Sequence, residues 1–348
     1  MSDRIALLVD CDTGIDDALA LLYLAASPDA DLCVVTCTGG NVDARQVAAN
    51  TRAVLALAGR ADVPVALGRE APLVRPLVTT PETHGPQGIG DAVLPPPAQP
   101  LAPESGPDRI VAEARRRPGA LTLLTLAPLT DLAVALAQEP RLPWLLRRVV
   151  IMAGAFGGDG NTQPTTEWNA TVDPEALAAV LDAFRPEAAP AGSPAPPRPT
   201  IVPLDVTERH RIVPADLDAL AAYAGCGPGG RPLRPGDRED AVVRFVADAL
   251  RFYFAFHAEY DAVHGAYIHD AFAAAIALDP RLARTQPLTV DVETAGRLTA
   301  GETIADRRHR WGRPPNADVV TWADGAAFHA RFLQRLAALA RARQTGAA

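Results

Sequence analysis

Residues 7–22, LLVDCDTGIDDALALL, decide the fold. They begin with a short apolar run, which is typical of a strand that is covered on both faces of a sheet. A Thr-Gly turn follows, and the remaining residues have the apolar spacing of a helix. A strand that passes through a tight turn into a helix predicts the first half of a β-α-β unit.

The rest of the chain repeats this alternation of short apolar runs and helical segments. The pattern predicts an α/β fold with an open, mainly parallel, Rossmann-like sheet and helices on both faces. The candidate strands are residues 5–10, 32–38, 64–67, 121–126, 148–153 and 200–204. The candidate helices are residues 16–26, 43–59, 108–117, 129–138, 174–184, 239–260 and 325–342.

Three segments interrupt the alternation. Residues 71–107 are rich in Pro and Gly and predict a long functional loop. Residues 186–199 are rich in Pro and Ala and predict an extended surface excursion, and residues 225–238 have a similar character. Because strand-like segments resume after these interruptions, we expect residues 1–348 to form a single domain.

The charge balance is acidic, with a formal net charge of −8, and all 33 basic residues are arginine. The absence of lysine excludes a lysine Schiff base and the lysine of a phosphate-binding P-loop. The acidic balance also argues against a nucleic acid polymer as the partner, because phosphate binding needs a basic surface.

Several features predict a cytoplasmic protein without a membrane partner. No apolar run of about 18 residues is free of polar interruptions. The first apolar run is too short for the core of a signal peptide. The four cysteines contain no C-x-x-C pair, which is typical of free thiols in a reducing compartment.

Four carboxylates surround the first predicted turn. Asp10 and Asp12 end the strand, and Asp16 and Asp17 open the helix. Ligands bind at the carboxyl ends of strands in open α/β sheets, so these acids are expected to converge there. Their mutual repulsion favours a hard divalent cation with oxygen ligands. A pair such as Asp16 and Asp17 could instead cap the helix N-terminus.

The same stretch allows an alternative chemistry. Asp10-Cys11-Asp12-Thr13 also resembles the D-x-D-x-T of haloacid-dehalogenase-type phosphatases, in which the first Asp is the nucleophile. That fold usually uses a downstream lysine to compensate phosphate, and this chain contains none.

Polar residues also follow later strands. The set consists of Asn41, Asn161, Glu167 and Asn169. Amides and a carboxylate at that edge are suited to the hydroxyls of a sugar, although each residue alone is typical of a turn.

His269 and Asp270 precede an apolar helix, and a histidine is the natural acid or base near neutral pH. His257 and His264 suggest a second metal cluster, but a zinc site would leave the oxygen-rich cluster unexplained.

Together these segments resemble the nucleoside hydrolase family, the inosine-uridine-preferring nucleoside N-ribohydrolases. DCDTGIDDALAL is similar to the family signature D-x-D-x-G-x-D-D-A, and the resemblance extends over essentially the whole chain. The other similar segments, in the same order, are HGPQGIG at 84–90, the loop at 151–176, IVPLDVT at 201–207, HDAFAAA at 269–275 and RPPNADV at 313–319.

The resemblance implies a tightly bound Ca²⁺ and specific roles for the residues around it. Asp12, Asp17, Asp270 and the backbone carbonyl of Leu126 would bind the ion, Asp12 would be the base for the attacking water, and Asp10 would support this shell. Asp16 and Asn169 would hold the 2′- and 3′-hydroxyls of the ribose, Asn161 and Glu167 its 5′ end, and Asn41 would complete the sugar site. His269 would be the acid for the leaving base, and His84 would flank the base.

The predicted function is therefore Ca²⁺-dependent hydrolysis of the N-glycosidic bond of ribonucleosides, by a homo-oligomer that is a dimer or a tetramer. The phosphatase with Asp10 as nucleophile and a non-catalytic nucleoside- or ribose-binding protein are the alternatives. The chain departs from the family pattern at Leu126, Asp131 and Trp168, where Thr, Asn and Phe are common. These differences bear on base specificity, which the sequence does not predict.

Overall fold

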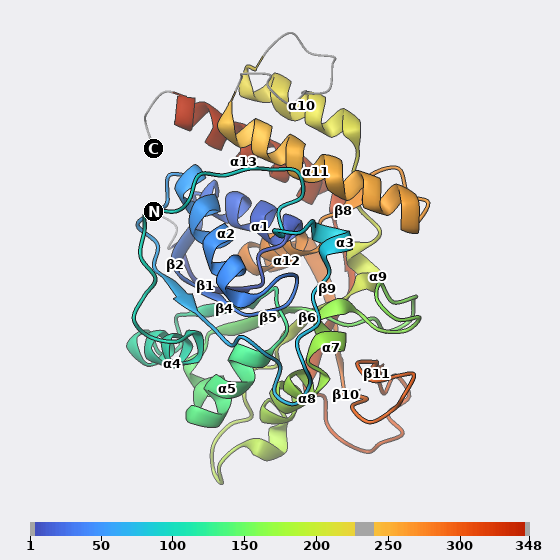
Figure 1. The fold of residues 1–348 in the computed structure, drawn as a ribbon. Helices are drawn as coiled ribbons and strands as arrows, with labels where there is room; N and C mark the ends of the chain where they lie inside the picture. Colours follow the sequence, from blue (N-terminus) through green and yellow to red (C-terminus); the bar gives the residue numbers. More distant parts are fainter. Residues whose placement is uncertain (1–3, 227–239, 345–348) are drawn as a thin grey trace.

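The computed structural model describes residues 4–226 and 240–344 (Figure 1). Its centre is an eight-stranded sheet in the order β3-β2-β1-β4-β5-β6-β12-β9. The pairs from β3 to β12 are parallel, and β9 joins β12 in the antiparallel sense. The strands are β1 Ile5–Cys11, β2 Ala30–Cys37, β3 Val65–Leu67, β4 Thr122–Thr125, β5 Arg148–Met152, β6 Thr200–Val202, β9 Ala283–Leu288 and β12 Ala317–Ala323.

Helices cover both faces of this sheet (Figure 1). One face carries α1 Ile15–Ala25, α2 Ala44–Leu57, α10 Pro214–Ala224, α11 Ala241–Tyr260, α12 His269–Leu278 and α13 Gly325–Gln344. The other face carries α4 Gly106–Arg116, α5 Thr130–Gln138, α6 Leu142–Leu145 and α8 Pro174–Ala183. The predicted open, mainly parallel α/β fold is confirmed.

The two faces enclose separate apolar clusters. In β1, Leu7 and Val9 belong to the cluster under α1 and α2, whereas Leu8 belongs to the cluster under α4 and α5. This division follows from the two-residue period of a strand, which directs successive side chains to opposite faces. The continuous apolar run of β1 therefore serves both clusters, as expected for a strand buried on both faces.

Short elements complete the connections. The remaining helices are α3 Pro81–His84, α7 Trp168–Val172 and α9 Leu204–Thr207, with single 3₁₀ turns η1 at Pro186–Ala188 and η2 at Pro280–Leu282. Two small antiparallel pairs are formed by β7 Arg211–Ile212 with β8 Ala266–Tyr267, and by β10 Val290–Val292 with β11 Thr303–Ala305. Over the described residues, no helix has both the length and the apolar character to cross a membrane.

The sequence pattern missed two neighbouring strands of the sheet, β12 and the edge strand β9. β9 reads ARTQPL, most of its residues are exposed, and it contains Pro287, so no apolar run marked it as a strand. Such a strand is typical of a sheet edge, where a proline and polar side chains are tolerated. The predicted loop 71–107 contains the short helix α3 and the start of α4. Of the predicted stretch 225–238, residues 227–238 lie outside the described residues.

The cluster that joins α12 and α13 gives a stability prediction. Phe328 stacks on Phe272, with ring centroids 4.6 Å apart, and is almost fully buried. Phe328→Ala is expected to lower the free energy of unfolding by roughly 3–5 kcal/mol, because it removes a buried ring and leaves a cavity. Urea denaturation measures the change. Leu298→Ala, at a side chain that is 69% exposed, is the control and should change stability by about 0.5 kcal/mol or less.

Candidate active site

The first turn places a carboxylate at the centre of a hydrogen-bond network. Asp17 accepts hydrogen bonds from the backbone N–H groups of Gly14 at 2.9 Å and Asp12 at 3.2 Å. Asn41, which follows β2, donates its side-chain amide to Asp17 at 3.2 Å and its backbone N–H to Asp12 at 2.8 Å. The ends of two neighbouring parallel strands therefore meet at this point, as the sequence predicted.

The carboxylates of Asp16, Asp17 and Asp270 form a candidate cation site. Each offers an oxygen atom, and these atoms lie within 4.8 Å of one another. Asp270 comes from the first turn of α12, so the N-termini of α1 and α12 both face the cluster. The positive ends of the two helix dipoles favour negative charge there.

Burial and mutual repulsion dominate the electrostatics of this cluster. Burial, followed by the charge of the neighbouring Asp17, raises the pKa of Asp16 to about 8. Burial, followed by the charges of Asp16 and Asp17, raises the pKa of Asp270 well above its ordinary value. Asp12 lies beside the group, and its pKa is raised by burial and by Asp17. Without a compensating positive charge, these acids hold protons at neutral pH.

The donor set fits a hard divalent cation. The side-chain oxygens Oδ1 of Asn41 and of Asn169 are buried and have no hydrogen-bond partner. Unsatisfied buried oxygens of this kind are costly unless a ligand meets them. Carboxylates and amide oxygens are the ligands that Ca²⁺ prefers in proteins. The described residues contain one such group of acidic, histidine or cysteine ligands, so His257 and His264 do not form a second metal cluster there.

Asn169 ties the ends of β4 and β5 to the same site. Its side-chain amide donates to the carbonyl oxygens of Leu126 at 2.8 Å and Met152 at 3.0 Å. Both strand ends line the cavity described below. The carbonyl oxygen of Leu126 can accept a second interaction, so it remains available as a ligand.

Asp10 lies behind the cation site and does not line the cavity. Its carboxylate accepts hydrogen bonds from the hydroxyls of Thr36 at 2.7 Å and Thr38 at 3.4 Å, and it is fully buried. Burial and the nearby Asp131 raise its pKa. This position agrees with a supporting role and offers no support for Asp10 as the nucleophile of a phosphatase, because a nucleophile must reach the substrate.

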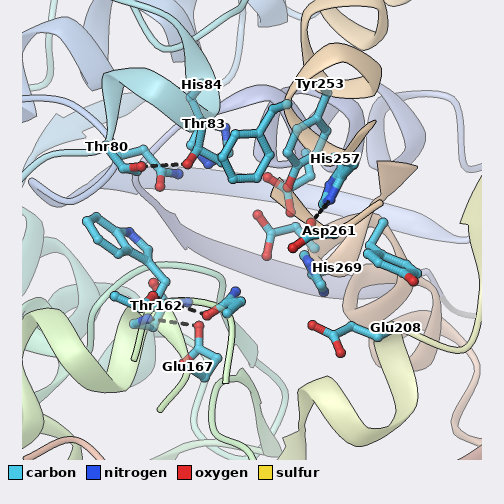
Figure 2. Close-up of a pocket in the computed structure, with 18 of the residues that line it drawn as sticks. Thr80, Thr83, His84, Thr162, Glu167, Glu208, Tyr253, His257, Asp261 and His269 are labelled. Atoms are coloured by element: carbon cyan, nitrogen blue, oxygen red, sulfur yellow. Dashed lines mark hydrogen bonds and ion pairs between the residues drawn. The ribbon is translucent and has the colours of Figure 1, made fainter. Parts of the chain in front are cut away.

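A cavity of about 560 Å³ opens above the carboxylates (Figure 2). It is lined by most of the predicted site residues: Asp12, Asp16, Asn41, His84, Leu126, Asn161, Glu167, Asn169, His269 and Asp270. Asp17 does not line the cavity. It lies beneath these residues and accepts hydrogen bonds from Asp12 and Asn41, which do line it. This volume is suited to a small organic molecule.

Two of the predicted sugar ligands have different environments. The buried carboxylate of Glu167 accepts the backbone N–H groups of Gly154, Asn169 and Ala170 at 2.8–3.0 Å, so it also caps α7. Asn161 is exposed at the cavity and contacts Thr162 at 3.2 Å. The cap holds Glu167 rigidly, whereas Asn161 is less constrained by its neighbours.

Residues of α11 and of the segment after it form one wall of the cavity. Tyr253, His257 and Asp261 recur every four residues and line the cavity together with Tyr267 and Glu208 (Figure 2). Their spacing places them on one helix face. That periodicity was the available signal, but the aromatic residues are also typical of a helix that packs on a core.

Comparisons with known proteins agree with this geometry. The family model described as "Inosine-uridine preferring nucleoside hydrolase" matches residues 7–330. The pyrimidine-specific ribonucleoside hydrolase RihA of Klebsiella pneumoniae is 34% identical over 334 residues, which are 95% of this chain and 98% of that protein. RihA of an Enterobacter species is 34% identical over 332 residues, covering 95% of this chain and 97% of that protein.

A solved structure supports the same assignment. The purine-preferring ribonucleoside hydrolase from Gardnerella vaginalis matches with a TM-score of 0.84 and 26% identity, over 97% of this chain and 99% of that one. The open α/β sheet and the buried acidic cluster at its strand ends agree with a hydrolase of this class. The chain belongs to the inosine-uridine preferring nucleoside hydrolase family, and the predicted enzyme class is confirmed.

The acidic cluster predicts an unusual dependence of stability on pH. Between the ordinary Asp value of 3.8 and the raised pKa of Asp16, about 8, the folded protein holds a proton that the unfolded chain releases. The free energy of unfolding of chelator-treated protein should therefore fall as the pH rises from 4 toward 8. Added CaCl₂ should flatten this slope, because a cation replaces the protons. Urea denaturation across this range, with EGTA or CaCl₂, measures both slopes; identical slopes would contradict the cation site.

Proposed function

We propose that the protein hydrolyses the N-glycosidic bond of ribonucleosides to a free base and ribose, and that it depends on Ca²⁺. The observation that carries the proposal is the group of buried carboxylates from α1 and α12 at the floor of the cavity, within a chain of this family. A group of like charges without a cation is costly to bury, whereas a cation site that also binds a diol accounts for it.

The ribose is proposed to lie on the polar floor of the cavity. Asp16 and Asn169 line this floor and are suited to accept and position the 2′- and 3′-hydroxyls. Asn41 completes the sugar site, and Glu167 and Asn161 lie where the 5′ end would extend. Asp12, Asp17, Asp270 and the carbonyl of Leu126 would hold the Ca²⁺, which would orient the diol and the attacking water.

The chain's own residues supply the electrostatics of bond cleavage. As the bond between C1′ and the base breaks, positive charge develops on the sugar and negative charge on the base. Carboxylates held beneath the sugar stabilise that positive charge, and they are fixed in advance by backbone hydrogen bonds. Asp12, whose Oδ2 is oriented by the Asn41 N–H, is proposed to take the proton of the attacking water.

A nucleoside panel tests the proposal. Uridine, cytidine, inosine, adenosine and guanosine should be tested, because the names of the similar proteins include both pyrimidine-specific and purine-preferring enzymes. We expect release of base from at least one of them, loss of release after EGTA treatment, and recovery with CaCl₂. Binding of ribose or a nucleoside without turnover would favour the non-catalytic alternative. Turnover that is unaffected by chelation would contradict the cation.

Asp12→Asn tests the role of the proposed base. The substitution keeps the size of the side chain but removes its ability to take a proton, so kcat is expected to fall roughly 10³-fold. Thermal unfolding should show that the variant still folds. Asp62→Asn, at an exposed ion pair with Arg60, is the control and should have unchanged kcat. Wild-type turnover by Asp12→Asn would contradict the assignment.

The oligomeric state and the cellular location are proposals from the sequence. We propose a homo-oligomer, a dimer or a tetramer, in the cytoplasm. None of the four cysteines, all of which lie within the described residues, forms a disulfide, which agrees with a reducing compartment. Light scattering on the purified protein measures the oligomeric state directly.

A further inference from the structure

Three histidines line the cavity, and they differ in the partner of their Nδ1 atom. His84 accepts a hydrogen bond from the backbone N–H of Ile15 at 3.1 Å. A backbone N–H can only donate, so this nitrogen of His84 must be unprotonated. Burial lowers the pKa of His84 to about 3, in agreement with a neutral ring.

His269 has an uncharged partner. Its Nδ1 lies 2.7 Å from the hydroxyl of Thr207, and its ring is buried. A hydroxyl can donate or accept a hydrogen bond, but it does not compensate the charge of an imidazolium as a carboxylate does.

His257 alone among these three has a carboxylate partner. Its Nδ1 lies 2.5 Å from Oδ2 of Asp261, and the side chains are 6% and 44% exposed. Burial lowers the pKa of His257 below its ordinary value, and the hydrogen bond and the charge of Asp261 offset part of this lowering. His257 also lies in the last turn of α11, where the helix dipole favours a cation. Its Nε2 is buried and has no hydrogen-bond partner.

The rings around His257 form a wall that is suited to a planar base. His84, Tyr253, His257, Tyr267 and His269 follow one another with neighbouring ring centroids 4.6–6.0 Å apart. All five line the cavity, and the labels of Figure 2 show the three histidines and Tyr253 along one side of it. A heteroaromatic base bound against this wall would present its nitrogen and oxygen atoms to the histidines.

We propose that His257, oriented by Asp261, is a further proton donor to the leaving base, in addition to the predicted acid His269. This inference rests on the proposed nucleoside hydrolysis and assigns a further catalytic residue to it. Asp261 accepts the proton of Nδ1, so Nε2 is bare in the neutral ring and carries the transferable proton when the ring is an imidazolium. Asp261 is a positioning residue, because it acts through its hydrogen bond to His257.

The proton and electron balance of the step is complete. The bond between C1′ and the base nitrogen breaks, and its electron pair leaves with the base. Nε2 of the His257 imidazolium gives its proton to the base. The water oxygen bonds to C1′, keeps one of its protons as the new hydroxyl, and passes the other proton to Asp12. Exchange with solvent restores both groups, and the partly exposed Asp261 leads from the histidine toward bulk water.

Other charges also face this pair. Glu208 lines the cavity, and burial followed by the charge of Asp261 raises its pKa to about 7. His84 and His269 belong to the same row of rings as His257. Asp261 therefore compensates the positive charge that His257 carries before it donates a proton.

The test compares a substrate that needs protonation of its leaving group with one that does not. The first is the nucleoside that the wild-type enzyme cleaves fastest, and the second is p-nitrophenyl riboside, whose nitrophenolate leaves without a proton. We expect His257→Gln to lower kcat/KM for the nucleoside roughly 10²-fold, and for p-nitrophenyl riboside about threefold or less. Asp261→Asn, which retains a hydrogen-bonding side chain, should change the ratio of the two values in the same direction.

A second His–Asp pair in the chain provides the matched control. His329 lies 2.9 Å from Asp216 and does not line the cavity, so His329→Gln should leave both values unchanged. Asp248→Asn, at a carboxylate of α11 that pairs with Arg251, is the control for Asp261.

The outcomes separate this inference from the proposed function. A fall in the nucleoside value relative to the riboside value, in both variants, supports the proton donor. Equal losses on both substrates, or no loss on either, overturn it, because a residue that only packs the wall does not distinguish leaving groups. If the wild-type enzyme cleaves neither substrate, the proposed function itself fails.

Discussion

The mutual repulsion of the buried carboxylates at the strand ends is the constraint on which the rest of the site depends. Asp12, Asp16, Asp17 and Asp270 are brought together from two helices and one strand end, away from water. Backbone N–H groups and two helix N-termini stabilise their charge in part. The remaining free-energy cost of burying these like charges favours a divalent cation at the site. The anionic floor is in turn suited to a sugar that becomes cationic as its glycosidic bond breaks.

The cavity has two sides that differ in construction. The floor consists of strand ends and first helical turns, whose side chains are held by backbone hydrogen bonds, as Glu167 and Asn169 show. The opposite wall is aromatic and comes from α3, α11 and the segment that leads to α12. A rigid polar floor suits the invariant sugar of a nucleoside, whereas the wall meets the part that varies between nucleosides.

Much of the fold could be predicted because its strands are buried on both faces. Such strands are continuous apolar runs, and all six that were predicted are present, with ends that differ by at most two residues. β12 was missed because Asp318 and Thr321 interrupt its apolar run. The edge strand β9 could not be found in this way, because an edge faces solvent and does not need an apolar run. The motif DCDTGIDDALAL was equally informative about the floor, because the strand, the turn and the helix that position its acids are all local.

The aromatic wall of the cavity could not be predicted from the sequence in the same way. His257 and His264 are close in the sequence and suggested a metal pair, but the structure places His257 at the cavity beside Asp261 and leaves His264 exposed. The role of a histidine depends on the partner of each ring nitrogen, which comes from the backbone of α1 for His84 and from α9 for His269.

The sequence by itself therefore determined the family, the sheet and the acidic floor, because local spacing is enough to place residues that share one turn. The charged partner of His257 is also local, since Asp261 follows it by four residues. Only the tertiary structure decided that His84 and His269 have uncharged partners, because their Nδ1 contacts form between segments 69 and 62 residues apart and no local pattern encodes them.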